Sequence, residues 1–435
     1  MGLYTAEYKK KLVSAEDAVR KVKNGSTIVH GLAAAEPPAI LKALADRVRA
    51  GEIDNLKVHS LLPVETVSKT LLAPDISDCI EAYSWFVSKA TRAAVKVGLS
   101  YFVPNHFHQV PRLMKDNLDI DVTVTSVSPM DESGFFSFGT ANDYTSTVAR
   151  CCRRLIVEVN ENMPRVFGDS LLHISEVDAI VENTSPLIEF KWPKSTAADE
   201  KIGKYVCEMV PDGATIQLGF GGLPNTIAEG LVNHKDLGIH TEVLGPAMVL
   251  LLKKGAVTGQ RKNLHPRKNV FTVAEGTHEL YEFMNNNPSM ESYPVSYTND
   301  PDVIAHNDNM ISINSIIQVD LLGQCNAEYL EGAQFSGTGG QLDYVRGAYN
   351  SKNGKSILAF KATAKNGQVS RVVARLDTGV AVTTPRMDVH YLVTENGVVD
   401  LKGKSTRDRA LAIISIAHPR FRDDLLREAE NMYLL

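Results

Sequence analysis

The chain has 435 residues, of which 44% are hydrophobic and 22% are charged. At roughly 150 residues per domain this length gives two large domains or about three smaller ones, and the composition excludes a chain dominated by disorder. The net charge of −5 gives no electrostatic reason to expect nucleic acid or an anionic membrane as a partner, although it is compatible with a local site for a small anion.

The N-terminal segment MGLYTAEYKKKL carries lysines but no apolar core, so it does not look like a secretory signal. The most apolar stretch, residues 243–252, is too short to cross a bilayer and is followed by two lysines. The cysteines are odd in number and have no CxxC spacing, which fits neither a disulfide framework nor a zinc ribbon. We therefore expect a reduced, cytoplasmic protein.

Helical and strand-like segments alternate from the start of the chain. Residues 15–25 have apolar positions at helical spacing and end on a glycine. Residues 26–32 are typical of a strand that runs into small residues, and residues 37–50 restart a helix with proline in its first turn. Strand, small-residue turn and helix in this order predict an α/β unit.

The same plan returns in residues 201–234, which predicts two related halves. Three positions correspond: Gly25 with Gly213, Gly31 with Gly219, and Pro37 with Pro224. The polar, proline-containing stretch 182–200 is the expected boundary, with an N-terminal half of residues 1–190 and a C-terminal half of residues 191–435. The alternative is a chance alignment of two ordinary α/β units.

A second correspondence exposes a difference between the halves. His59-Ser60-Leu61 pairs with His240-Thr241-Glu242, so a leucine in the first half stands where the second half has a glutamate. A carboxylate at the end of a buried strand, beside a glycine-rich turn, packs poorly and is well placed for chemistry. Glu242 is therefore the candidate catalytic residue.

Two glycine-rich segments are candidates for ligand binding. Residues 219–223 lie between a predicted strand and helix, where glycines allow close approach and a helix N-terminus offers N–H groups to an anion. Pro224 stands where a dinucleotide fingerprint needs its last glycine, which disfavours a nicotinamide cofactor. Residues 334–348 contain the second cluster, SGTGG. The alternatives are a tight turn without a ligand and a low-complexity loop.

The turn over residues 31–37 is the first-half counterpart of the 219–223 turn. Its three successive alanines leave room, and Leu32 and Leu61 offer an apolar wall, which favours a small apolar group of a ligand at this turn. The alternative is that Ala33, Ala34 and Ala35 only pack a strand end against a helix. His106 and His108 lack partner ligands at metal-site spacing, so no metal site is expected.

The ordered set of motifs resembles the family I CoA-transferases of the acetyl-CoA hydrolase/transferase type, in particular the 4-hydroxybutyrate and butyrate–acetate CoA-transferases. The matching segments run along nearly the whole chain: AEPP, FVPNHFHQVP, VSPMDESGFFSFG, GFGGLP, GIHTE, QFSGTGGQLDYVRGA, VTTPRMDVHYLVTENG and RALAIISIAHPRFRDDL. The resemblance implies two similar α/β halves with the active site at their interface, the acyl side in the first half and the CoA side in the second. It also implies a homo-oligomer, a dimer or higher.

Site residues carry over from the family's motifs. The glutamate of the HTE step implies that Glu242 is the nucleophile, and the CoA-binding positions fall on Gly219, Phe220, Gly221, Gly222, Leu223, Gly340 and, in the strand before it, Ile317. Coenzyme A is then a co-substrate, with no permanently bound cofactor and no metal.

The implied reaction moves coenzyme A between a short-chain acyl-CoA and a free carboxylate, through a glutamyl anhydride and a glutamyl-CoA thioester. The expected acids are 4-hydroxybutyrate, butyrate or acetate, or a small dicarboxylate such as succinate or itaconate. An acyl-CoA hydrolase on the same scaffold is one alternative. A non-catalytic acyl-CoA sensor is another, and the presence of Glu242 argues against it.

Overall fold

The computed structural model describes residues 4–190 and 194–435, which form two compact units. Within the described residues, unit 1 comprises residues 4–190, 270–298 and 334–337, and unit 2 comprises residues 194–269, 299–333 and 338–435. The chain first passes between units after Phe190, and it later returns to unit 1 twice. Both returning segments fall within residues 191–435, the C-terminal half predicted from sequence, because neither has a length or composition that separates it from its neighbours.

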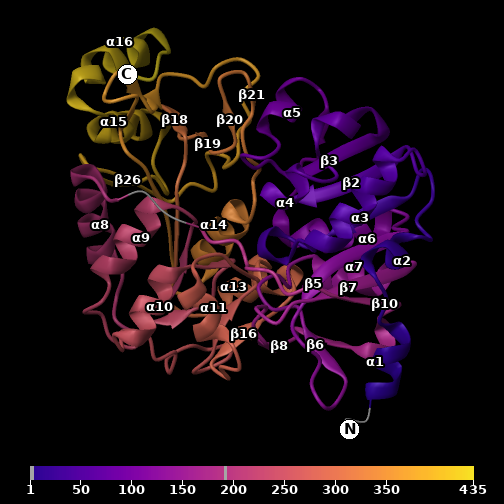
Figure 1. Ribbon diagram of the computed structural model, residues 1–435. Helices are drawn as coiled ribbons and strands as arrows, with labels where there is room; N and C mark the ends of the chain where they lie inside the picture. The colour runs from indigo at the N-terminus through magenta and orange to yellow at the C-terminus, as the bar shows by residue number, and fades with distance from the viewer. Residues whose placement is uncertain (1–3, 191–193) are drawn as a thin grey trace. The chain divides into compact units, whose positions relative to one another are not determined.

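Unit 1 contains a seven-stranded sheet in which every neighbouring pair is parallel. Its strands are drawn in indigo to magenta in Figure 1. In spatial order they are β10 (Ala179–Glu182), β7 (Arg154–Val159), β5 (Val122–Val127), β1 (Thr27–His30), β2 (Leu56–Leu61), β3 (Ile80–Phe86) and β4 (Ser100–Phe102). All six residues of β5 are buried, as expected for a central strand of a parallel sheet that is covered on both faces.

Unit 2 contains a six-stranded sheet that is parallel except at one edge. In spatial order its strands are β12 (Gly238–Ile239), β11 (Thr215–Leu218), β17 (Met310–Asn314), β22 (Lys355–Ala359), β26 (Tyr391–Thr394) and β27 (Gly397–Asp400). The antiparallel pair is β26 with β27, which a two-residue turn connects. A hairpin of this kind needs no crossover helix, whereas the parallel pairs do.

The two sheets share one topology over five strands. The order β10-β7-β5-β1-β2 in unit 1 matches β26-β22-β17-β11-β12 in unit 2. The register also agrees, because Thr27 pairs with Lys57 in unit 1 and Thr215 pairs with Gly238 in unit 2. Counting on from these pairs brings His59-Ser60-Leu61 onto His240-Thr241-Glu242, as the sequence comparison predicts. The internal repeat is therefore structural rather than a chance alignment.

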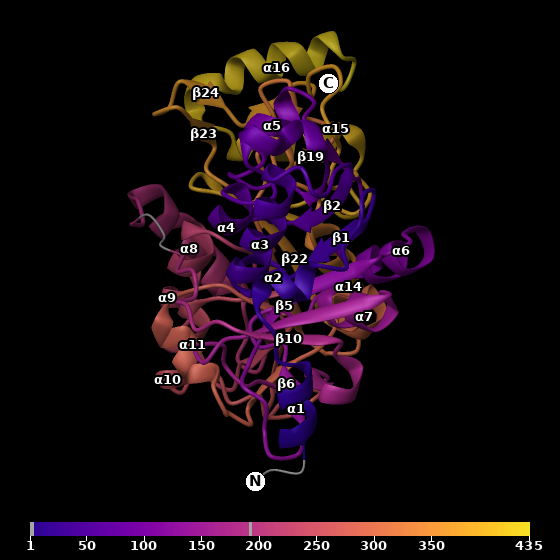
Figure 2. The ribbon, with the colours of Figure 1, turned by 45° about the vertical axis from the view of Figure 1, so that its right-hand side comes forward.

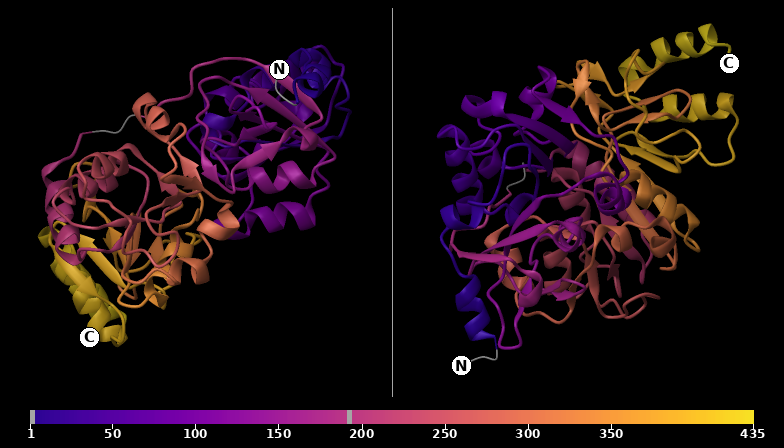
Figure 3. Two further views of the ribbon diagram at one scale, coloured as in Figure 1. Left: turned by 90° about the horizontal axis from the view of Figure 1, so that it is seen from below. Right: turned by 90° about the vertical axis from the view of Figure 1, so that its right-hand side faces the viewer.

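Helices cover the sheets of both units. In unit 1 they are α1 (Thr5–Lys11), α2 (Ala15–Val19), α3 (Pro38–Arg49), α4 (Glu65–Ser68), α5 (Arg92–Lys96), α6 (Val110–Asn117), α7 (Thr145–Cys151), α11 (His278–Met284) and α12 (Val295–Thr298). In unit 2 they are α8 (Ala197–Met209), α9 (Gly222–Gly230), α10 (Pro246–Lys253), α13 (Pro301–Ala305), α14 (Gln341–Asn350), α15 (Thr406–Ile416) and α16 (Arg422–Asn431). Helices α2 and α3 contact each other (Figure 2), as do α8 with α9 (Figure 1) and α15 with α16 (Figure 3).

The predicted helix over residues 37–50 is confirmed as α3, but the helix predicted over residues 15–25 is wrong in its second half. Helix α2 ends at Val19. The backbone N–H of Ser26 donates to the Lys23 carbonyl at 3.2 Å, and Gly25 takes a positive φ of 74°. This turn redirects the chain into β1, and it prevents the helix from continuing although the apolar spacing would allow it.

The small-residue turn after β1 is packed inside unit 1. Ala33, Ala34 and Ala35 form a short 3-10 turn and are all buried. Ala33 and Ala35 share an apolar core cluster with Leu32 and Leu61. These contacts favour close packing as the role of the alanines, which is the alternative to an acyl pocket in the sequence analysis.

Candidate functional site

The turn between β11 and α9 begins with a glycine that must approach its neighbours closely. The Gly219 N–H donates to the Ile313 carbonyl of β17 at 2.7 Å. A Cβ on Gly219 would lie 3.1 Å from Oδ1 of Asn314 and 3.3 Å from the Ile313 carbonyl oxygen. Gly221 has a φ of 136° and caps α9, a conformation that side chains other than glycine rarely adopt. Position 219 therefore requires glycine for lack of space, and position 221 requires it for its backbone conformation.

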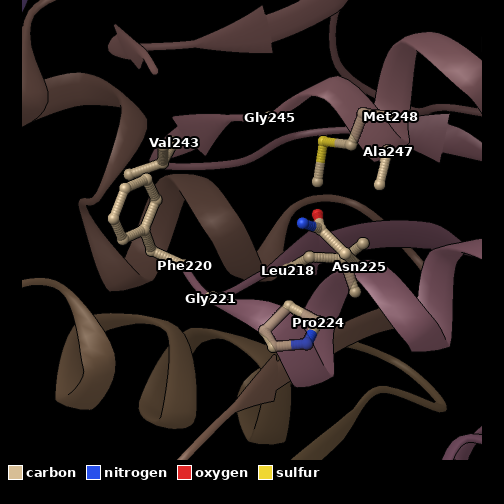
Figure 4. A pocket seen from close by; sticks show the side chains of 10 residues that line it. Leu218, Phe220, Gly221, Pro224, Asn225, Val243, Gly245, Ala247 and Met248 are labelled. Atoms are coloured by element: carbon tan, nitrogen blue, oxygen red, sulfur yellow. The ribbon is translucent and has the colours of Figure 1, made fainter. Parts of the chain in front are cut away.

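This turn forms one wall of a small pocket, shown in Figure 4. The opposite wall comes from β13 (Val243–Leu244) and the first turns of α10. The Phe220 and Val243 side chains lie at one end of the pocket, and Asn225 and Met248 lie at the other (Figure 4). Phe220 is 42% exposed, although an apolar side chain of this size is usually buried. The pocket thus offers apolar surface beside the N-terminus of α9.

Glu242 lies between β12 and β13, directly before the pocket residue Val243. Its carboxylate Oε2 accepts a hydrogen bond from the Asn299 side-chain amide at 2.5 Å, and its carboxylate also accepts one from the Gly340 backbone N–H. Asn299 is fully buried, and its Oδ1 has no hydrogen-bond partner among the described residues. Two donors from distant parts of the chain therefore converge on one carboxylate.

The environment of Glu242 raises the pKa of its carboxyl to about 7. Burial is the main cause, because a desolvated carboxylate is costly, and the negative charge of Asp343 raises the pKa further. The hydrogen bonds from Asn299 and Gly340 act in the opposite direction, since they stabilise the ionised form. Near neutral pH both forms of Glu242 are populated.

Gly340 cannot be replaced without disturbing this carboxylate. A Cβ at position 340 would lie 1.8 Å from Oε2 of Glu242 and 2.2 Å from Nδ2 of Asn299. Gly340 also caps α14, so the N–H groups of that helix N-terminus face the same region. The glycine at the end of SGTGG is thus a contact residue of Glu242.

The structure brings several of the predicted site residues together, and it places one of them in a different local structure from the one predicted. Glu242 and Gly340 are in contact, and Gly219, Phe220 and Gly221 line the pocket that Val243 closes. Gly222 and Leu223 form the first turn of α9. Ile317 was predicted to lie in a strand, but it lies in the bend between β17 and β18 (Gln318–Asp320). Its N–H donates to the Asn326 carbonyl at 2.8 Å, which holds the bend outside the ladder of β17.

Sequence reasoning missed Asn299. The segment Asn299-Asp300-Pro301 has the composition of a turn before a helix, and Asp300 does cap α13. Nothing local separates a turn asparagine from one that hydrogen-bonds to a carboxylate 57 residues away. Only the fold shows that Asn299 points to Glu242.

The described residues also bear on metal sites and membrane spans. Residues 4–190 and 194–435 contain no group of three or more His, Cys, Asp or Glu side chains that could hold a metal ion. In that same part of the chain, no helix combines the length and the apolar character needed to span a membrane.

Comparison with known families finds two matches. The acetyl-CoA hydrolase/transferase N-terminal domain matches residues 2–190, and the C-terminal domain of the same family matches residues 276–429. The residues of the Glu242 site are divided between the C-terminal match, which holds Asn299 and Gly340, and the stretch between the two matches, which holds Glu242 and the turn after β11.

Individual proteins are similar over almost their whole length. The chain is 44% identical over 432 residues to a succinyl-CoA:cyclohexane-1-carboxylate CoA transferase of Geobacter metallireducens, covering 99% of this chain and 97% of that one. It is 44% identical over 428 residues to a 4-hydroxybutyrate coenzyme A transferase of Clostridium kluyveri, covering 98% and 99%. The crystal structure of RipA from Yersinia pestis superposes with a TM-score of 0.96 at 48% identity, covering 99% of each chain. The chain therefore belongs to the acetyl-CoA hydrolase/transferase family.

Proposed function

We propose that this protein transfers coenzyme A between an acyl-CoA and a free carboxylate, with Glu242 as the covalent nucleophile. The observation that carries the proposal is the convergence of the Asn299 amide and the Gly340 N–H on the Glu242 carboxylate. Burying Asn299 costs free energy because its Oδ1 has no hydrogen-bond partner, so Asn299 is a poor choice for merely stabilising a buried acid. A reacting acid, in contrast, needs donors that are already oriented toward it.

The first step requires ionised Glu242. A carboxylate oxygen attacks the thioester carbonyl, the carbon–sulfur bond breaks, and the products are an acyl-glutamyl anhydride and the CoA thiolate. The raised pKa makes the carboxylate a stronger base and nucleophile than an exposed one, while about half of it remains ionised near pH 7.

In the second step the thiolate attacks the glutamyl carbonyl of the anhydride. The free acid leaves with the bonding electron pair, and Glu242 becomes a glutamyl-CoA thioester. A carboxylate acceptor then reverses both steps and departs as its CoA thioester, so atoms and charge balance without ATP. The energy of the thioester is retained throughout.

The two donors have a role in each attack on the glutamyl carbonyl. That carbonyl oxygen becomes an oxyanion in the tetrahedral intermediates. The Asn299 amide and the Gly340 N–H already lie at the carboxyl group of Glu242, so they stabilise that charge without reorganising. Removal of one such donor costs about 3–4 kcal/mol of transition-state stabilisation in well-studied cases.

Coenzyme A is assigned to the turn after β11 and its pocket. The N-terminus of α9 suits an anionic or carbonyl group, and Phe220 and Val243 offer apolar surface to a pantetheine chain. The acids named in the sequence analysis, among them 4-hydroxybutyrate, butyrate and succinate, are the proposed acceptors, in keeping with the names of the relatives. Homo-oligomerisation and residence in the cytoplasm complete the proposal.

The test is to trap the intermediate. Incubation with acyl-CoA alone, followed by borohydride, converts a glutamyl thioester into an alcohol that peptide mass spectrometry locates. We expect the modification at Glu242 only, and none in Glu242→Gln, which folds but transfers at least about a thousandfold more slowly. Trapping at another residue, or transfer by a Gln variant shown to be free of deamidation, would contradict the assignment. Acyl-CoA loss over many turnovers without an acceptor acid, beyond the single turnover that forms the thioester, would instead identify a hydrolase.

A further inference from the structure

Beneath the turn after β11, two buried amides form a reciprocal pair. Gln217 on β11 donates through Nε2 to Oδ1 of Asn314 at 3.1 Å, and Asn314 on β17 donates through Nδ2 to Oε1 of Gln217 at 3.0 Å. Gln217 is 3% exposed and Asn314 is 8% exposed. Neither side chain can rotate without breaking two hydrogen bonds away from water, so the pair fixes both.

The pair contacts the first glycine of the turn. Oδ1 of Asn314 is the closest atom to the place that a Cβ on Gly219 would occupy, and Gly219 follows Gln217 by two residues. Gly219 is in turn tied to β17 through the Ile313 carbonyl. The position of the backbone at Gly219 therefore depends on the neighbouring strand and on the amide that stands against it.

Unit 1 makes the corresponding strand end and close glycine without the amides. The register places Val29 where unit 2 has Gln217 and Thr125 where it has Asn314. The Gly31 N–H donates to the Val124 carbonyl at 2.9 Å, and a Cβ there would lie 2.5 Å from Oγ1 of Thr125. A valine and a threonine thus suffice to build the strand end and the close glycine. The buried amides of unit 2 need another reason than the fold.

The amide pair is present only in unit 2, which is also the unit that holds the proposed nucleophile. At the carboxyl ends of corresponding strands, unit 2 has Glu242 where unit 1 has Leu61, and an amide pair where unit 1 has Val29 and Thr125. Burying two amides brings little net stability, since their hydrogen bonds replace those with water. It does impose one arrangement on the groups nearby.

We propose that the Gln217–Asn314 pair is a positioning device that holds the turn after β11 in its CoA-binding conformation. The inference rests on the proposed function, because it takes that turn as the CoA site. Without the pair, Gly219 and the following residues can take other conformations, and binding must select one of them. The loss should fall on steps in which CoA enters from solution. It should spare the acceptor acid, which meets CoA already bound to Glu242.

The experiment transplants the unit 1 residues. Gln217→Val and Asn314→Thr each leave one buried amide unpaired, so both should lower the melting temperature. The double variant removes both amides and should regain most of that stability, because replacing both partners of a buried hydrogen bond can be nearly neutral. We expect the double variant to bind CoA about tenfold more weakly by calorimetry, the loss that corresponds to one or two hydrogen bonds.

The kinetic readout separates positioning from a structural role. In the double variant, kcat/KM for acyl-CoA should fall about as much as CoA affinity, while kcat/KM for the acceptor acid changes much less. Recovery of both stability and CoA affinity in the double variant would overturn the proposal, as would an equal loss for both substrates. If that variant does not fold, Gln217→Met with Asn314→Leu replaces it under the same criteria. Failure of the wild-type protein to bind CoA would contradict the proposed function instead.

Discussion

At the scale of single residues, the proposed chemistry depends on a buried carboxylate, Glu242, which is costly to ionise and accepts two hydrogen bonds. Burial and the charge of Asp343 raise the pKa of Glu242, and Asn299 and Gly340 offset part of that rise. The resulting pKa of about 7 places the ionisation of Glu242, the proposed nucleophile, near neutral pH. The pH dependence of the activity should therefore follow the ionisation of Glu242.

A pH profile tests that connection. Because only ionised Glu242 attacks, kcat/KM for acyl-CoA should rise about tenfold per pH unit at low pH and level off above a midpoint of about 7. Asp343→Asn removes a charge that raises this pKa, so its midpoint should move to lower pH. Rates measured at constant ionic strength, corrected for uncatalysed thioester hydrolysis, would show this. A profile that is flat through neutrality in both proteins would contradict the role of Glu242.

Gly340→Ala is the sharpest steric test. The added methyl would lie 1.8 Å from Oε2 of Glu242, so either the carboxylate or the start of α14 must move. We expect kcat to fall at least about a hundredfold, since a misplacement near 1 Å at a reacting group has this effect, with little change in unfolding temperature. Gly203→Ala is a matched control, because Gly203 lies inside α8 and the atom nearest to its would-be Cβ, Cγ2 of Thr226, is 3.7 Å away. Comparable activity loss in both variants would remove the argument for Gly340.

At the scale of elements, the N-terminus of helix α3 is stabilised by a side chain from elsewhere in unit 1. Helix α3 has proline at its N-cap and no side-chain cap of its own. Instead, Oε2 of Glu158 on β7 accepts the N–H groups of Ala39 and Ile40 at 3.0 and 3.1 Å. Burial raises the pKa of Glu158 to about 7 despite these bonds. A buried acid can thus serve a helix N-terminus and need not be catalytic.

Glu158→Ala should therefore destabilise unit 1 without touching the chemistry. The substitution leaves two helix N–H groups and the Asn183 amide without their acceptor, which costs about 1–3 kcal/mol per buried unsatisfied group. Urea denaturation would measure the loss, and kcat of the folded fraction should be unchanged. Glu65→Ala, at an exposed pair with Lys69, is the control and should have little effect. Equal midpoints for the two variants would show that Glu158 does not support α3.

At the scale of the whole molecule, the proposed reaction predicts a kinetic pattern that depends on the complete reaction cycle and not on one contact. A covalent enzyme–CoA intermediate separates the two half-reactions, so the acid product leaves before the acceptor acid binds. Double-reciprocal plots at several acceptor concentrations should be parallel. Intersecting lines would indicate a ternary complex and direct attack of the acceptor on acyl-CoA.

The sequence alone determined the α/β class, the internal repeat and the family, and each is confirmed. These features follow from short stretches of sequence, namely apolar periodicity, glycine and proline at element ends, and short motifs in a fixed order along the chain. Glu242 also emerged from sequence, because comparing two copies of one unit isolates the position where a core leucine becomes a carboxylate. Local patterns were less reliable at element ends, as the early end of α2 and the bend at Ile317 illustrate.

Only the tertiary structure decided what surrounds Glu242 and the turn after β11. Asn299 lies 57 residues from Glu242 along the chain, and Gln217 lies 97 residues from Asn314. The local sequence around an asparagine or a glutamine does not show whether its side chain ends a turn, faces solvent or hydrogen-bonds to a partner in the core. The pKa of Glu242 is likewise a property of burial and of Asp343. Such contacts arise because parallel strands from distant segments end at the same edge of a sheet, and that edge exists only once the sheet has formed.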